Sequence, residues 1–270
     1  MSTATPRAGG GQEALTWYHT LELPGGVVTP GMYDLRKAAT TVPLPSSLEG
    51  KRCLDVGTRD GFWAFEMERR GAAEVVGIDL DDPDDFDWPQ PRRPLDESER
   101  RALEGGGDGF AYAHAALGSN VERRDLSVYD LGQSGIGRFD VAFIGTLLLH
   151  LRDPIGALGA VRSVLGDGGE LILNEVVSLS LSLTRRGPAA TLLTVGEAPY
   201  WWVPNLAGLR RYVQMAGYEI AASSRPYLIA YGEGLRAPPI SLRGFSLPMQ
   251  LLHRRGAPHA WVRARPKLQY

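Results

Sequence analysis

The chain has 270 residues, 43% of them hydrophobic and 22% charged, a composition typical of a soluble globular protein. Its single cysteine, Cys53, excludes an intramolecular disulfide and favours a reducing cytoplasm, and no apolar run reaches the ~18 residues of a membrane span. The net charge of −2 hides an asymmetry, because residues 181–270 carry twelve Arg and Lys against three Glu. This basic third either faces phosphates or is solvated and paired with the acidic remainder.

Two segments precede the first predicted strand. Residues 1–15 have no apolar signal-peptide core, and we expect them to form a disordered tail. Residues 16–50 are predicted to form a lid or cap, because they carry the aromatic stretch WYH at 17–19. His19 in this stretch has a reference pKa near ~6.5, which makes it a candidate proton acceptor.

From residue 51 onward, short β-rich runs alternate with helical patterns, which predicts an α/β domain over residues 51–270. The sheet is expected to be mostly parallel, seven-stranded and covered by helices on both faces. Six of its strands are predicted at 52–56, 74–79, 121–125, 140–145, 170–177 and 259–266, and the seventh follows a helix that begins after Asn205.

Helices are predicted at 62–70, 109–118 and 154–166, with Gly71 and Gly166 at the ends of two of them. Residues 83–108 are rich in Pro, Asp, Arg and Gly and are longer than an ordinary connection, so they predict a surface insertion. Residues 178–258 are expected to build the substrate pocket.

A glycine-bearing loop, DVGTRDG at 55–61, joins the first strand to the first helix, where backbone amides can approach a ligand. Asp79 ends the second strand and is placed to accept both hydroxyls of a ribose, so the ligand is predicted to contain a nucleoside. A dinucleotide site normally has three glycines, but Arg59 occupies the second position. Asp55 would repel a pyrophosphate and attract an ammonium group, which favours S-adenosylmethionine over a nicotinamide dinucleotide.

Further candidates lie beyond the third strand. His150 follows the fourth strand on the ligand-facing edge of the sheet, where it is either a base or substrate contact or simply a helix-start hydrogen bond. The stretch APYWWVPN offers Tyr200, Trp201 and Trp202 as apolar walls or as a stacking platform for a planar substrate. Three adjacent aromatic residues cannot all face one way, so at least one is expected in the core.

Four stretches, LDVGTRDGFW, VVGIDL, FDVAFIGTLLLHLRDP and LGDGGELILNE, are similar to motifs of class I S-adenosylmethionine-dependent methyltransferases. This resemblance covers roughly residues 16–220 and implies a Rossmann-like fold. The chain most resembles the subgroup of tRNA wobble-uridine (5-oxyacetic acid) carboxymethyltransferases, in which a Trp-containing segment precedes the domain and an FD…LYH…P pattern marks the fourth strand.

The resemblance also implies roles for individual residues. The cofactor would be held by residues of the loop and the strand ends, namely Asp55, Gly57, Thr58, Gly61, Asp79, Leu80, Leu126, Ser127 and Gly145. Substrate contacts are expected from aromatic residues and one lysine, namely Trp17, Lys37, Tyr200, Trp201 and Trp202.

The chain departs from the carboxymethyltransferase pattern at three positions. Leu149 replaces the tyrosine of LYH, His19 aligns with a lysine, and His259 stands where an arginine is expected. A carboxylated cofactor would lose roughly 1–3 kcal/mol with each missing donor, so ordinary S-adenosylmethionine is favoured.

These observations together predict a cytoplasmic methyltransferase that uses S-adenosylmethionine and a small, planar or polar acceptor. His150 and His19 are its candidate catalytic residues, and neither a metal nor a membrane is expected. Three alternatives stay open at this point: a tRNA-modifying (carboxy)methyltransferase, a nicotinamide-dependent oxidoreductase, and a cofactor-binding regulator without catalysis.

Overall fold

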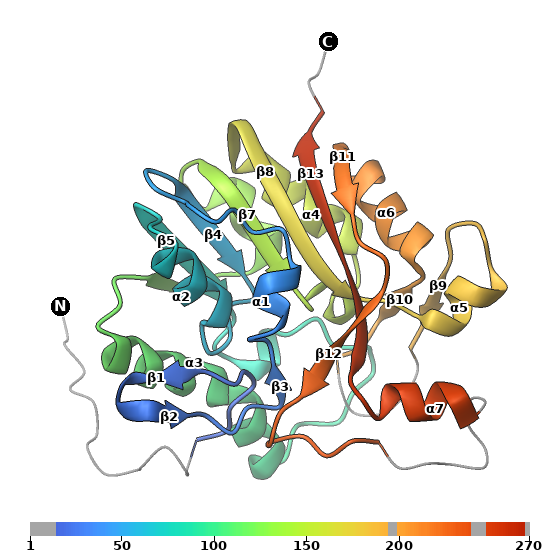
Figure 1. Cartoon of the computed structure of the whole chain (residues 1–270), viewed down its shortest axis with the longest axis horizontal. Coiled ribbons are helices and arrows are strands. Elements are labelled where there is room, and N and C mark those ends of the chain that lie inside the picture. The colour runs from blue at the N-terminus through green and yellow to red at the C-terminus, as the bar shows by residue number, and fades with distance from the viewer. Residues whose placement is uncertain (1–14, 194–198, 239–246, 268–270) are drawn as a thin grey trace.

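A nine-stranded sheet forms the centre of the molecule (Figure 1). The computed structural model describes residues 15–193, 199–238 and 247–267, so the predicted tail lies almost wholly outside the described residues. Seven strands make up the main sheet, in the order β6 (Glu122–Asp125), β5 (Glu74–Asp79), β4 (Arg52–Val56), β7 (Phe139–Gly145), β8 (Leu165–Val176), β13 (Ala257–Pro266) and β11 (Tyr218–Ser223).

Most of these seven strands run in one direction. Strands β6, β5, β4, β7 and β8 pair in parallel. Strand β13 is antiparallel to β8, and β11 is antiparallel to β13, so β11 runs with the parallel set. The predicted mostly parallel α/β sheet is therefore confirmed, although the sheet has nine strands where seven were predicted.

Two strands that the sequence did not predict widen the sheet. Strand β12 (Tyr227–Tyr231) follows β11 along the same side of β13, and β3 (Tyr33–Asp34) pairs with β12. Because β3 belongs to the N-terminal segment, it joins that segment to the main sheet. Two residues show no alternation, so the pattern could not have indicated this strand.

Seven helices are described, and five of them bury side chains against one or the other face of the sheet. They are α1 (Ala38–Thr41), α2 (Phe62–Arg69), α3 (Glu97–Leu117), α4 (Pro154–Ser163), α5 (Leu179–Thr184), α6 (Leu206–Met215) and α7 (Leu247–His253). Shorter pieces connect them, namely β1 (Glu22–Leu23), η2 (Pro24–Gly26), β2 (Val27–Val28), η3 (Pro83–Asp85), η4 (Val128–Gln133), η5 (Leu148–His150), β9 (Ala190–Leu192) and β10 (Trp202–Pro204).

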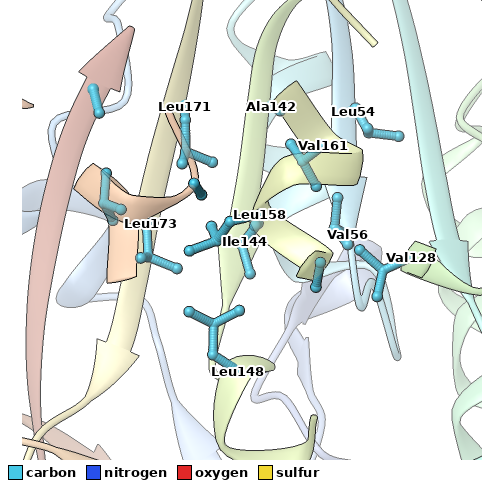
Figure 2. Packing of buried hydrophobic residues seen from close by; sticks show 14 of the residues in the cluster. Leu54, Val56, Val128, Ala142, Ile144, Leu148, Leu158, Val161, Leu171 and Leu173 are labelled. Carbon is cyan, nitrogen blue, oxygen red and sulfur yellow. The ribbon is translucent and has the colours of Figure 1, made fainter. Parts of the chain in front are cut away.

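Each face of the sheet buries its own hydrophobic cluster, because successive side chains of a strand point to opposite faces. In β7, Ile144 belongs to the cluster beneath α4 and α6, whereas Phe143 belongs to the cluster beneath α2 and α3. Figure 2 shows Leu158 and Val161 of α4 lying among the buried side chains of β4, β7 and β8. Strands covered on both faces read as continuous apolar runs, which is why the sequence located them well.

Local capping fixes where two of the helices begin. The Asp153 carboxylate accepts the N–H of Gly156 at 2.8 Å at the start of α4, and the Asn205 side chain accepts the N–H of Gly208 at 2.7 Å before α6. The predicted N-cap at Asn205 is thus confirmed. Gly166, predicted to end a helix, instead lies in β8, because α4 stops at Ser163 and Leu165 already pairs with β7.

Helix α3 begins at Glu97, well before the start predicted at residue 109. Asp96 and Glu99 form a reciprocal capping box, in which each side chain accepts the backbone N–H of the other. The helix therefore occupies part of the segment predicted as a surface insertion, and the glycines at 105–107 concealed it. Across the described residues, no helix combines the length and apolarity needed to cross a bilayer.

Candidate active site

The loop that follows β4 folds back onto the end of β5. The N–H groups of Gly57 and Thr58 both donate to the carbonyl of Ile78, at 2.9 and 3.0 Å. Gly57 has φ 78° and Gly61 has φ 90°, a left-handed conformation that favours glycine. A Cβ at Gly61 would also lie 2.4 Å from the Phe65 ring. Both glycines are therefore required by the turn that starts α2.

Asp79 joins this loop to the neighbouring strand ends. Its two carboxylate oxygens accept the N–H of Arg59 at 2.7 Å and of Leu80 at 2.9 Å. Its carbonyl accepts the N–H of Leu126 at 2.9 Å, which holds the end of β6 beside the end of β5. Ser127 follows and accepts the N–H of Tyr129 as the cap of η4. The structure thus gathers Asp79, Leu80, Leu126 and Ser127 at one edge of the sheet.

Asp55 is a buried carboxylate with no cation beside it among the described residues. Only 2% of the residue is exposed, and the hydroxyl of Thr58 donates to Oδ2 at 2.8 Å. Burial outweighs this hydrogen bond and raises the pKa of Asp55 to about 7. Thr58 packs closely against Gly77 of β5, where an added Cβ would lie 2.9 Å from the Thr58 hydroxyl. Its hydrogen bond to Asp55 therefore comes from a side chain that is itself held in place.

The donor set around the loop fits a cofactor that brings its own ammonium group. The buried carboxylate of Asp55 would be stabilised by a cationic partner, whereas a pyrophosphate would meet the carboxylates of Asp55 and Asp79. The Arg59 guanidinium is turned away toward α3, where it donates to the Leu103 carbonyl at 2.9 Å and lies 5.7 Å from the centre of the Tyr18 ring. The geometry favours an ammonium-bearing nucleoside over a dinucleotide.

A hollow opens beside Gly145, where β7 ends. Its volume is about 10 Å³, enough for about one water molecule. Half-buried tyrosines, buried histidines and small polar groups line it together with apolar side chains, and no lysine or arginine is among them. The lining residues are Tyr18, His19, Tyr33, Leu35, Trp63, Gly145, Thr146, Asn174, Ile229 and His259.

Asp60 ties the N-terminal segment to the glycine loop. Its Oδ2 atom accepts the N–H groups of Tyr18 at 2.6 Å and His19 at 2.8 Å, and the residue is fully buried. Burial raises the pKa of Asp60 to about 6 against the lowering effect of these hydrogen bonds. Sequence reasoning did not single out Asp60, although an acidic residue inside a glycine loop was a signal.

The two candidate histidines occupy different places. His19 lines the hollow and is 5% exposed, and its Nδ1 atom has no hydrogen-bond partner among the described residues. Burial and the nearby Arg59 lower the pKa of His19 to about 3. His150 bonds through Nδ1 to the Pro199 carbonyl at 3.0 Å and faces the Tyr200 ring, outside the residues that line the hollow. Burial lowers the pKa of His150 to about 4, so both rings are neutral at pH 7.

None of the residues predicted to contact the substrate is among those that line the hollow. Trp201 donates through Nε1 to the Asp87 carbonyl, and Trp202 to the Arg152 carbonyl, so both indoles fasten loops. Trp17 is buried against α3, with its ring 5.9 Å from that of Tyr112, and Lys37 is exposed at the start of α1. Tyr200 alone of the three adjacent aromatics faces a candidate histidine.

A second buried acid escaped sequence reasoning. Glu175 in β8 is fully buried and accepts the N–H of Leu148 at 2.6 Å and of Val176 at 2.9 Å. Burial raises the pKa of Glu175 to about 7. The hydrogen bond from the Leu148 N–H to Glu175 fixes η5, the turn that carries His150. The only sequence signal was its place directly after the apolar run at 171–173 and Asn174, within a strand.

A family model described as a methyltransferase domain matches residues 33–223. The chain belongs to the methyltransferase domain family. Membership confirms the predicted class, an S-adenosylmethionine-dependent methyltransferase, and with it the predicted cofactor. The nicotinamide alternative is therefore not retained.

Several curated proteins are similar in sequence to part of this chain. The chain is 30% identical over 177 residues to a tRNA U34 carboxymethyltransferase of Pseudomonas aeruginosa, and the match covers 63% of this chain and 46% of that protein. It is 26% identical over 153 residues to a ubiquinone biosynthesis O-methyltransferase of Acinetobacter baylyi, covering 57% of this chain and 52% of that protein. The chain spans about half the length of the curated relatives it matches.

The fold also resembles a solved methyltransferase. The Burkholderia thailandensis 1,6-didemethyltoxoflavin-N1-methyltransferase, crystallised with 1,6-didemethyltoxoflavin and S-adenosylhomocysteine, superposes with a TM-score of 0.51 at 14% identity. The match covers 87% of this chain and 78% of that one. At this identity the likeness establishes the shared fold.

Proposed function

We propose that this methyltransferase transfers a methyl group from S-adenosylmethionine to a small, planar or polar acceptor molecule. The observation that carries the proposal is the hollow beside Gly145, with its aromatic and uncharged polar lining. Its volume of about 10 Å³ holds about one water molecule, so an acceptor enters only as the lining side chains move apart. A single planar ring between Tyr18, Tyr33 and Trp63 suits such walls.

The predicted cofactor residues divide the binding task among them. Asp55 and the backbone at Gly57 and Gly61 would take the amino and carboxylate groups of the methionine part, with Gly145 beside it. Asp79 would accept the ribose hydroxyls through lone pairs that its two backbone hydrogen bonds leave free. Leu80, Leu126 and Ser127 would hold the adenine. The bound cofactor supplies an activated methyl group on its sulfonium sulfur.

The protein's own contribution is alignment and the exclusion of water. Tyr18 and His19 close one wall of the hollow, and Asp60 holds their backbone in place. We retain His19 as a neutral hydrogen-bonding group toward the acceptor. The ring centres of His150 and Tyr200 lie 5.1 Å apart, and His150 would act on the acceptor from behind Tyr200.

Methyl transfer is favoured over carboxymethyl transfer by the charges around the hollow. A cofactor carrying an extra carboxylate would place an anion among side chains that include no lysine or arginine. Burial lowers the pKa of His259 to about 4, so this histidine supplies no positive charge at pH 7. Leu149, the residue that replaces a tyrosine of the carboxymethyltransferase pattern, is buried and apolar.

The test is to incubate the enzyme with methyl-labelled S-adenosylmethionine, or in parallel with its carboxylated form, in the presence of small metabolites and bulk RNA, and to measure the mass gained by each product. We expect label in a small molecule, with a mass gain of a methyl group. Asp79→Ala is the matched control and should transfer nothing. Label found only in RNA, or a carboxymethyl gain from the carboxylated cofactor alone, would overturn the proposal.

A second candidate, modification of tRNA, is favoured by one surface feature. Among the described residues, Arg185 and Arg186 after α5 and Arg210 and Arg211 on α6 make no ion pair, whereas most arginines before residue 153 do. Unpaired arginines attract phosphates, and such binding weakens steeply with salt. Salt-sensitive binding of bulk tRNA, lost in Arg210→Gln/Arg211→Gln, would support this candidate; no binding at low salt would remove it.

We further propose a cytoplasmic location for the enzyme. The support is its single cysteine, Cys53, which is buried and unpaired, as expected of a protein in a reducing compartment.

A further inference from the structure

Thr146 and His259 form a hydrogen-bonded pair in the wall of the hollow. The Thr146 hydroxyl lies 3.1 Å from Nε2 of His259, and both residues line the space beside Gly145. Thr146 follows β7, and its N–H donates to the Asn174 carbonyl of β8 at 2.9 Å. His259 lies near the start of β13, on the other side of β8. The sheet therefore brings together two residues that are distant in the chain.

The chemistry of its neighbours fixes the protonation state of His259. Nδ1 lies 2.9 Å from the Ala257 carbonyl, and a carbonyl only accepts hydrogen bonds, so Nδ1 carries the proton. The residue is 1% exposed, and burial keeps the ring neutral. Nε2 is therefore a bare acceptor, to which the Thr146 hydroxyl donates. The oxygen of Thr146 keeps its lone pairs for a group in the hollow.

The backbone at Thr146 points to the same conclusion. Thr146 has φ 55°, a left-handed conformation that is unfavourable for a β-branched residue and that glycine would adopt without strain. Strained residues of this kind cluster at sites where a side chain is needed in one place. A hydroxyl in this wall is the feature that glycine would not provide.

We propose that Thr146 and His259 relay the proton that the acceptor loses during methyl transfer, so that the acceptor is a hydroxyl or an N–H group. This inference rests on the proposed function. As the acceptor's lone pair bonds to the methyl carbon, the carbon–sulfur electron pair returns to sulfur. The acceptor's proton moves to Oγ1 of Thr146 while the hydroxyl proton of Thr146 moves to Nε2 of His259. The threonine is restored, and one positive charge passes from sulfur to the imidazolium.

In this relay Thr146 is the catalytic residue, and His259 acts through it. A neutral histidine suits this position because the site then carries one positive charge throughout, on sulfur before the transfer and on the imidazolium after it. A fixed cation there would oppose the sulfonium before transfer. A carbon acceptor or a thioether has no such proton to give, so the relay defines the substrate class as protic oxygen or nitrogen.

Three variants separate the relay from a structural role. Thr146→Ser keeps the hydroxyl, Thr146→Val keeps the shape without it, and His259→Gln keeps an acceptor for Thr146 that takes up no proton. With labelled S-adenosylmethionine and the metabolite pool, we expect Ser to retain most of the wild-type kcat. Val and Gln should lose on the order of 100-fold in kcat, at unchanged affinity for S-adenosylhomocysteine.

A spectroscopic measurement tests the pair without turnover. In protein labelled with ¹⁵N-histidine at pH 7, we expect His259 to carry its proton on Nδ1, and Thr146→Val, unlike Thr146→Ser, to shift the Nε2 resonance. A proton on Nε2, or no response to Thr146→Val, would overturn the pair. Wild-type turnover that survives in Thr146→Val and His259→Gln would overturn the relay alone. No transfer by the wild type to any small molecule would overturn the proposed function and the relay with it.

Discussion

Removing the Asp60 carboxylate should detach the N-terminal segment from the glycine loop. In the wild type, one oxygen of Asp60 accepts both the Tyr18 and the His19 N–H, at 2.6 and 2.8 Å, in a fully buried position. Each buried donor left without a partner costs about 1–3 kcal/mol. The loss of both partners should cost Asp60→Ala about 2–6 kcal/mol, and removal of the buried charge, whose pKa is raised to about 6, offsets about 3 kcal/mol of this.

Asp60→Asn is the matched control, because it keeps an oxygen in the same place and removes the charge. Burial raises the pKa of Asp60 to about 6 from 3.8, so ionisation of the buried group costs about 3 kcal/mol near neutral pH. The amide NH₂ would take the place of Oδ1, which has no partner, at a cost of about 1–3 kcal/mol. The two effects offset, and we expect the stability of Asp60→Asn to lie within about 1 kcal/mol of the wild type.

Two assays test this prediction, one of amide protection and one of the free energy of unfolding. Hydrogen exchange by mass spectrometry should show lost protection of the amides around residues 17–20 in Asp60→Ala and near-normal protection in Asp60→Asn. Urea unfolding at pH 7 should place the variants in the same order. Wild-type protection of this segment in Asp60→Ala would contradict the prediction, because it would mean that the two hydrogen bonds do not hold the segment.

Three further predictions concern the cofactor, the pH dependence and the loop. Asp79→Ala should abolish calorimetric binding of S-adenosylhomocysteine while leaving the circular dichroism spectrum intact; near-normal affinity would remove Asp79 from the cofactor site. His259 has its pKa lowered from 6.5 to about 4, so it contributes stability above pH 6.5 that is lost as the pH falls toward 4. Between pH 7 and 5 the wild type should therefore lose about 2 kcal/mol more than His259→Gln in urea unfolding, and parallel profiles would contradict this. Gly61→Ala should destabilise far more than Gly50→Ala, since both need a left-handed φ but only at Gly61 would the Cβ meet a ring, at 2.4 Å; equal melting temperatures would refute the steric argument.

The sequence predicted the centre of the fold because a buried parallel strand can be recognised from its own short run of apolar residues. The predicted bounds of β4 and β5 agree with the structure, since both strands are apolar runs ended by a loop or an aspartate. The carboxyl ends of parallel strands share one edge, so Asp79, Leu126 and Gly145 were expected to lie along it. The structure places them there.

Contacts between distant parts of the chain could not be predicted in this way. Asp60 lies 42 and 41 residues from the amides that it binds, and Thr146 lies 113 residues from His259. Neither pair leaves a periodic pattern, because each depends on the packing of a whole strand or segment against the sheet. The three aromatics at 200–202 illustrate the converse, since composition showed their presence but only packing decided that Trp201 and Trp202 fasten loops.

The most direct test of the account is a crystal structure of the protein grown with S-adenosylhomocysteine. We predict the nucleoside between the glycine loop and the end of β5, with the ribose hydroxyls on Asp79, the amino group on Asp55 and the sulfur facing the hollow beside Gly145. A ligand bound elsewhere, or a sulfur turned away from that hollow, would contradict it.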